Sequence, residues 1–149
     1  MLKSLLRRTL PLLSFHLLAS ACSSEPSPEE LTRIALEAAS NEATRAYQLL
    51  LDHDYAGFIH ARQGMDTIGV APADSIGRQY KEQLIDACLQ YQHKLQTTHG
   101  GINTFTVSNA VMDSTIHQAH IFLLLQLGDS TQEEILVPMV EYKGKWVMK

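Results

Sequence analysis

The spacing of apolar residues changes at Gly100-Gly101, and this change constrains the fold more than any other feature of the sequence. Before the glycine pair, apolar side chains recur every three or four residues, which is typical of amphipathic helices. After it they alternate with polar side chains, which is typical of half-buried strands. Helices followed by an antiparallel meander predict an α+β domain with the helices packed on a sheet of about four strands.

The first helix has a clear start signal. Ser27 is a good N-cap, Pro28 suits the first helical position, and Glu30 completes a capping box. We expect this helix to end near Leu51, with a short helix or turn at residues 55–59 after it.

A loop at residues 63–72 precedes the next long helix, which we expect to begin at Asp74 or Ser75 and to end at the glycine pair. Its apolar side chains recur at helical spacing and predict one packed face. They are Ile76, Tyr80, Leu84, Ala87, Cys88, Tyr91 and Leu95.

The strands follow from residue 102. In the first, Phe105, Val107 and Val111 are predicted to share one face. The second, near residues 119–127, is apolar on both faces and is predicted to be central and covered on both sides. The third contains Pro138, which cannot donate a ladder hydrogen bond and therefore implies an edge, a bulge or a free amide position.

The amino-terminal end is typical of a secretory signal. Basic residues at positions 3, 7 and 8 precede an apolar run at residues 10–21, which is too short to span a membrane. The run ends in Leu-Leu-Ala-Ser-Ala-Cys22, which resembles the lipobox of bacterial lipoproteins. Ordinary signal-peptidase cleavage after Ala21 is the alternative, because Ala-Ser-Ala satisfies the small-x-small rule.

The lipobox resemblance implies that Cys22 is cleaved from residues 1–21 and acylated, so that the lipid bilayer is a partner. Two or three acyl chains would hold the protein at the membrane almost permanently. Residues 22–28 would then be a lipidated cysteine with a short tether, and residues 29–149 a single domain. The resemblance implies a bacterial cell-envelope location, with the outer membrane favoured because Ser23 replaces the aspartate of inner-membrane lipoproteins.

Charge excludes some partners. After residue 21 the chain has nine basic and 16 acidic residues, a net charge of −7. This balance argues against nucleic acid and against anionic lipid surfaces as partners. With Cys22 acylated, Cys88 has no partner for an intramolecular disulfide. The hydrophobic core of residues 22–149 must therefore stabilise the domain, and a chain of this length buries enough surface to do so.

Several segments together resemble a known family. They are Asp54-Tyr55-x-Gly57-Phe58, Gly101-Ile102, Gly128-Asp129-Ser130, the strand at residues 135–140, and Gly144-Lys145-Trp146. Over residues 29–149 the chain resembles the small lipoprotein domain of unknown function, common in Bacteroidetes, with the nuclear-transport-factor-2-like (cystatin-like) fold. The resemblance implies a curved sheet that forms a cone with the helices. It implies no particular chemistry, because a fold hosts many functions.

Enzymes with this fold place an acid or a histidine inside the cone, which makes inward-facing polar residues the candidates for a site. Strand parity places His117 and Glu141 on the inner face as catalytic candidates, and Tyr47 and Tyr55 are candidate ligand-binding residues at the pocket mouth. The simpler interpretation is that His117 and Glu141 lie near strand ends and meet water.

No metal or cofactor is expected. His117 and His120 are three apart on a strand and point to opposite faces. The denser group of Asp52, His53, Asp54 and His60 is explained more simply by a solvated helix terminus.

Cys88 and Trp146 each have two interpretations. Cys88 shares the apolar stripe of its helix, which favours a packed thiol over an intermolecular disulfide. Trp146, in the last strand, is predicted to plug the sheet rather than to anchor a ligand.

The sequence therefore favours an envelope lipoprotein that binds a small molecule or a protein without catalysis. One alternative is an isomerase-like or dehydratase-like enzyme with its pocket in the cone. The other is a structural protein that forms a homodimer through the sheet face. An apolar cone holding His117 or Glu141 would favour the enzyme, whereas a cone filled by aromatic and other large side chains would oppose it. Those side chains are Phe105, Phe122, Met139 and Trp146.

Overall fold

The computed structural model describes residues 25–149, so the expected signal peptide at residues 1–21 and Cys22 lie outside the described residues. Three helices precede four strands, which confirms the α+β class. No helix within residues 25–149 is long and apolar enough to cross a membrane. The elements are α1 (Pro28–Leu51), α2 (Tyr55–His60), α3 (Ser75–His99), β1 (Ile102–Asp113), β2 (Gln118–Leu127), β3 (Gln132–Tyr142) and β4 (Lys145–Met148).

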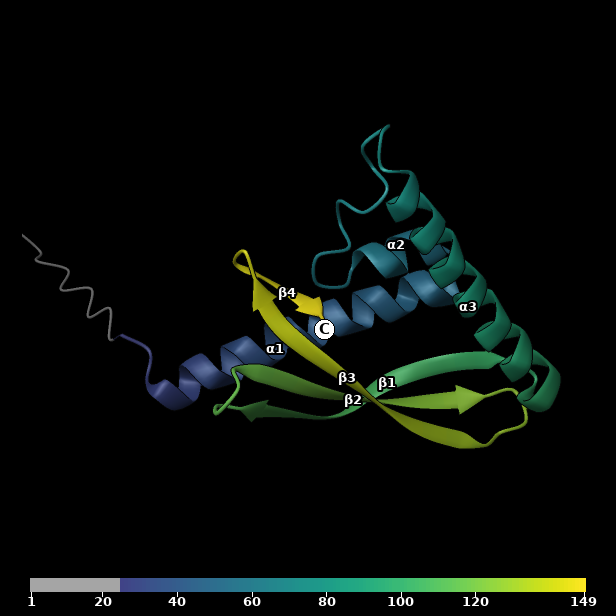
Figure 1. Ribbon diagram of the computed structural model, residues 1–149. Coiled ribbons are helices and arrows are strands. Elements are labelled where there is room, and N and C mark those ends of the chain that lie inside the picture. Colours follow the sequence, from purple (N-terminus) through teal and green to yellow (C-terminus); the bar gives the residue numbers. More distant parts are fainter. Residues whose placement is uncertain (1–24) are drawn as a thin grey trace, which may run out of the picture.

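Helix α1 lies across one face of the sheet (Figure 1). Its predicted start is confirmed, because the Ser27 hydroxyl accepts a hydrogen bond from the Glu30 amide at 3.2 Å. Three small side chains, Ala39, Ala43 and Ala46, are buried against the sheet. Small residues let the helix approach closely, so its main chain covers the centre of the sheet and little space is left beneath it.

The four strands form an antiparallel meander in the order β1-β2-β3-β4. β2 is central, and its inward side chains Ile121, Leu123 and Leu125 are completely buried. The prediction that this strand is covered on both sides is wrong, because the helices lie on one face of the sheet and the outward Phe122 and Leu124 are only half-buried. A register shift between Val107 and Asn109 in β1 corrects the prediction that Val107 and Val111 share a face. The extra residue of this bulge reverses parity, so Val111 lies on the outer face, which the helices do not cover.

Pro138 lies in β3, between β2 and β4, opposite His120. Its carbonyl accepts a hydrogen bond from the Lys149 amide at 2.9 Å, just beyond the last residue of β4. The main-chain side of Pro138 that lacks an N–H donor therefore faces the end of the short strand β4. Of the three predicted explanations, the structure confirms the one in which no ladder hydrogen bond is needed at this position.

Helix α3 begins and ends as predicted, with Asp74 as N-cap and Gly100 in the left-handed conformation (φ 75°). Its predicted packed face is wrong over the first turns, because Ile76 is 80 % exposed and Tyr80 is 44 % exposed. The helix leans away from the sheet (Figure 1), meeting α2 near its middle and β1 at its end, where Leu95 is buried. This tilt leaves an open wedge among the three helices.

Candidate binding site

The wedge contains an apolar cavity of about 260 Å³. All three helices contribute to its walls, and the short segment after α2 contributes one side chain. The lining residues are Tyr47, Leu50, Phe58, Ile59, Arg62, Leu84, Ala87, Cys88 and Tyr91.

Local helix geometry explains how these side chains meet. Leu84, Cys88 and Tyr91 are four and three residues apart on α3 and therefore share one face. Tyr47 comes from α1, and its ring contacts Phe58 edge-on with the ring centres 5.5 Å apart. Tyr47 also meets Phe105 of β1 at 6.2 Å between ring centres. These aromatic contacts close the cavity on the side of the sheet.

The two tyrosine hydroxyls of the cavity are neutral at pH 7. Burial raises the pKa of Tyr47 to about 12; nearby Tyr91 adds to this effect, and the Arg62 guanidinium opposes it. Burial also raises the pKa of Tyr91, with a further contribution from Glu133. Both hydroxyls therefore keep their protons, and each can donate a hydrogen bond to a ligand.

Cys88 lines the same cavity and is half-buried, and it forms no disulfide within residues 25–149. Burial raises the pKa of its thiol, although the Arg62 guanidinium acts in the opposite direction. Because the thiolate is the nucleophilic form, this environment makes Cys88 a poor nucleophile. Its position on the cavity wall, rather than in the closed core, is the difference from the sequence-based prediction.

Arg62 is the one charged residue among those lining the cavity. Its guanidinium donates to the Lys149 carbonyl oxygen at 3.1 Å. It makes no ion pair with an Asp or Glu side chain within residues 25–149. A cation at the edge of an apolar cavity can bind an anionic group of a ligand. The sequence carried no signal for this role, because Arg62 follows α2 in a turn without periodicity.

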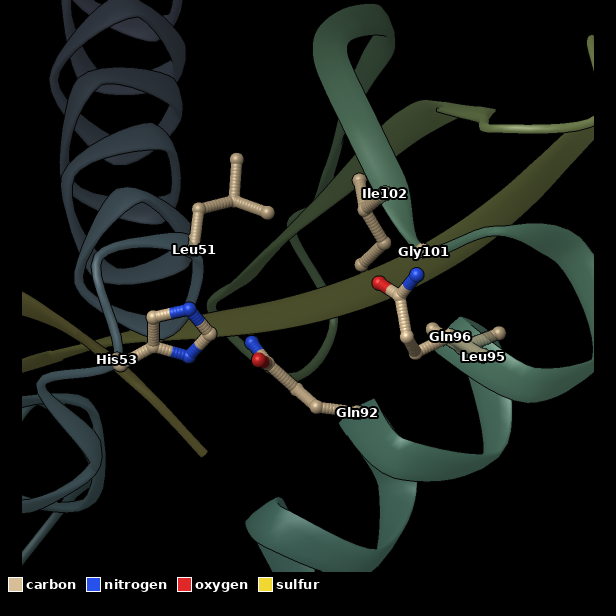
Figure 2. A pocket seen from close by; sticks show the side chains of 7 residues that line it. All are labelled: Leu51, His53, Gln92, Leu95, Gln96, Gly101 and Ile102. Carbon is tan, nitrogen blue, oxygen red and sulfur yellow. The ribbon is translucent and has the colours of Figure 1, made fainter.

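A second, more polar cavity of about 130 Å³ lies where α1 ends against α3. Figure 2 shows His53 and Gln92 on opposite sides of it, with Gln96 beside the start of β1. The Tyr55 hydroxyl lies 2.8 Å from His53 Nδ1 and donates to Gln92 Oε1 at 3.2 Å. The Gln92 amide in turn donates to the Leu50 carbonyl. This chain of hydrogen bonds ties the three helices together.

The four residues predicted to share a pocket do not come together. Tyr47 lines the apolar cavity, whereas Tyr55 belongs to the polar network on the other side of the helix junction. His117 precedes β2 in a left-handed turn (φ 51°) and is exposed, so strand parity does not apply to it. Glu141 is exposed opposite Trp146, and neither it nor His117 lines the two cavities.

The acidic residues after α1 serve as local caps. Asp54 accepts from the Gly57 amide at 2.9 Å and begins α2, while Asp52 accepts from the Gln48 side chain at 2.8 Å. Within the described part of the chain, no three His, Cys, Asp or Glu side chains are grouped to hold a metal ion.

Side chains fill the space between α1 and the sheet. Met139 is 1 % exposed, and Phe105 and Trp146 pack against the same core cluster. Phe122 points to the outer face of the sheet, because it alternates with the buried Ile121 and Leu123. Three of the four side chains expected to fill the cone therefore lie at the core, and Phe122 does not.

No family model and no curated protein matches the chain. Among solved structures, it is similar to a protein from Campylobacter jejuni named as an NTF2-like transpeptidase, at 14 % identity and a TM-score of 0.48. The similarity covers 72 % of this chain and 94 % of that chain. No residue role follows from a likeness at this level.

Proposed function

We propose that this chain is a membrane-anchored envelope lipoprotein whose domain binds a small, mainly apolar molecule carrying an anionic group. The observation that supports this proposal is the cavity in the helix wedge, which combines apolar walls with one guanidinium and two protonated hydroxyls. A concave apolar site with a few convergent polar groups is the usual form of a ligand pocket.

The size of the cavity sets the size of the ligand. A dry cavity of about 150 Å³ holds benzene, and drug-sized ligands occupy about 300–1,000 Å³. At about 260 Å³, this cavity suits a substituted aromatic ring or a short branched acid.

The positive charge of the cavity determines which charged group of a ligand is favoured. Arg62 has no competing carboxylate among the lining residues, so it favours an anion and disfavours a cation. The Tyr47 and Tyr91 hydroxyls add donors for an acceptor oxygen.

The same chemistry supports binding rather than catalysis. A general base works best with a pKa near the working pH, whereas the pKa of Tyr47 is about 12. The Cys88 thiol is also held neutral.

Nuclear magnetic resonance titration of the full chain with benzoate, benzamide and benzylamine tests this proposal. We expect shift changes at the tyrosines of the cavity, with affinity in the order benzoate, benzamide, benzylamine. The Arg62→Gln variant should bind benzoate no better than benzamide. Equal affinities for all three compounds in the wild-type protein would contradict the role of Arg62.

A variant that fills the cavity separates this site from general surface binding. Cys88→Phe places an aromatic ring on the cavity wall and should abolish benzoate binding. Leu89→Phe, at a position 45 % exposed on another face of α3, is the matched control and should bind normally. Binding that persists in Cys88→Phe would place the ligand elsewhere.

The membrane anchor is proposed from the lipobox resemblance at Cys22. The substitution Cys22→Ser is expected to prevent incorporation of labelled fatty acid and to release the protein from the membrane. A variant that remains membrane-bound and is cleaved at the same place would refute lipidation.

A homodimer through the outer face of the sheet is the second candidate. Two large side chains on this face are exposed, Leu136 by 50 % and Val111 by 45 %, and Phe122 lies between them on β2. An uncovered apolar sheet face is a favourable self-contact surface. We expect the full chain to have dimeric mass in detergent and Leu136→Glu to have monomeric mass. Val70→Glu, in an exposed loop, should remain dimeric, and a monomeric wild type at high micromolar concentration would exclude this candidate.

A further inference from the structure

A hollow larger than either cavity above lies on the other side of Arg62, which lines both it and the helix-wedge cavity. It is a groove of about 980 Å³ bounded by the middle of α1, by residues 60–66, and by the β3–β4 hairpin. Neither the predicted residues nor the proposed ligand cavity explains this groove. Two of its features, a free strand edge and an excess of positive charge, point to one kind of occupant.

The free edge belongs to β4. The Met148 amide donates to the Ala61 carbonyl at 3.0 Å, and the Met148 carbonyl accepts from Gln63 at 2.7 Å, so its main chain points away from β3. Main-chain direction alternates along a strand, and Trp146 therefore presents its amide and carbonyl on that same edge. No main-chain partner for Trp146 lies there within residues 25–149. This edge borders the groove.

The groove is basic in an acidic protein. Arg45, Arg62, Lys143 and Lys145 line it, which is four of the nine basic residues after residue 21. Of the 16 acidic residues in the chain, two line the groove, Glu42 and Asp66. Arg45 is paired with Glu42 at 2.8 Å, whereas the two lysines make no ion pair within the described residues.

We propose that this groove binds an extended acidic peptide segment of a partner protein, which adds to the sheet as a strand beside Trp146. The peptide main chain satisfies the free amide and carbonyl of Trp146, in the manner of β-strand addition. Its acidic side chains pair with Lys143 and Lys145 at the hairpin and with Arg45 on α1. The segment at residues 61–63 already pairs with Met148 in this way, and the incoming strand extends that pairing toward the hairpin.

The free edge distinguishes a peptide from other polyanions. A nucleic acid or sulfated glycan would use the cations but has no repeating main chain of amide and carbonyl groups to pair with the edge at Trp146. Lysines on a sheet edge also discourage pairing with basic or neutral strands, so the matching strand must carry negative charge.

The test uses the full chain in mild detergent and a fluorescein-labelled heptapeptide of alternating glutamate and valine. We expect saturable binding by fluorescence anisotropy, a change in the emission of the single tryptophan, Trp146, and weakening with added salt. A peptide with lysine in place of glutamate should not bind.

N-methylation of the probe tests the strand pairing without altering the protein. Methylating the amides that face β4 removes hydrogen-bond donors, and binding should fall by about tenfold or more. Methylating the alternate amides, which point away from β4, is the matched control and should change binding little. An equal loss of binding in both methylated series, or no loss in either, would overturn strand addition.

Charge variants test the basic residues. The double variant Lys143→Gln/Lys145→Gln should weaken peptide binding by roughly two- to thirtyfold, the range for two exposed ion pairs. Lys81→Gln/Lys94→Gln on α3 makes the same charge change outside the groove and should bind as the wild type does. Neither pair lines the helix-wedge cavity, so benzoate binding should stay unchanged in both.

Three further outcomes would overturn the proposal. One is the absence of peptide binding by a wild-type protein whose circular dichroism spectrum shows that it is folded. Another is an equal loss of binding in the two double variants. The third is equal binding of heparin or single-stranded DNA of matched charge, which would identify a general polyanion surface instead.

Discussion

The buried Tyr47 hydroxyl predicts a loss of stability in alkali. An exposed tyrosine has a pKa near 10, whereas the pKa of Tyr47 is about 12 because burial disfavours the phenolate. Between these two values the unfolded chain releases the proton and the folded chain keeps it. Stability from this group is therefore fully present below about pH 10 and is lost as pH rises toward 12.

The size of the effect follows from the difference in pKa. Each pKa unit corresponds to about 1.4 kcal/mol, so the difference of two units gives a full effect of about 2.7 kcal/mol. At pH 11, halfway between the two values, about 1.4 kcal/mol of unfolding free energy should be lost. This is a substantial part of the roughly 5–15 kcal/mol that stabilises a typical domain.

Urea denaturation followed by far-ultraviolet circular dichroism at pH 9 and pH 11 measures this loss. The Tyr47→Phe variant isolates it, because all other ionisations occur in both proteins. We expect the wild-type protein to lose about 1.4 kcal/mol more than Tyr47→Phe between the two pH values. The control Tyr80→Phe, at a position 44 % exposed, should behave as the wild type. If the wild type and Tyr47→Phe lose the same stability, the pKa of Tyr47 is not raised by burial.

Three other perturbations give defined outcomes. A Cβ at Gly128 would lie 2.5 Å from the Gly100 carbonyl oxygen, so Gly128→Ala should lose about 1–3 kcal/mol; Gly64→Ala, with no atom within 4 Å, should lose only about 1 for its left-handed backbone. The completely buried Ile121 predicts a loss of about 2–5 kcal/mol in Ile121→Ala, against less than about 1 in Val111→Ala; equal losses in urea melts would contradict the assigned core. Hydrogen bonds from the Thr131 side chain and then from His99 lower the pKa of Asp129 to about 2. Stability should therefore fall as pH drops from about 4 toward 2, and this acid dependence should be smaller in Asp129→Asn.

Contacts within a few residues explain what the sequence predicted well. The Ser27 cap, the Asp74 cap and the left-handed Gly100 depend on atoms of the same turn, so both long helices begin and end as expected. Alternation likewise identified β2 as the central strand. The polar candidate residues do not lie together, because their predicted positions depended on a strand pattern that does not extend into turns. His117 belongs to the turn before β2, and a turn does not obey strand parity.

The features that support function depend on distant contacts. The bulge near Val107 places Val111 on the outer face, and the tilt of α3 leaves its stripe exposed at Ile76 yet lining a cavity at Cys88. Helical spacing identifies which residues share a face but not how far that face lies from its neighbour. Arg62 acquires its position through the pairing of its segment with Met148, 86 residues later in the chain.

The sequence by itself determined the α+β class, the order of the elements and most of their ends, because hydrophobic period and capping are local properties. Tertiary structure alone decided where the wedge opens and which strand edge stays free. The wedge depends on the close packing of the small α1 residues on the sheet and on the tilt of α3, since rigid elements packed tightly at one end separate at the other. The free edge depends on residues 61–63, which pair with Met148 but do not reach Trp146. The cavity beside Tyr47 and the groove beside Trp146 follow from that geometry.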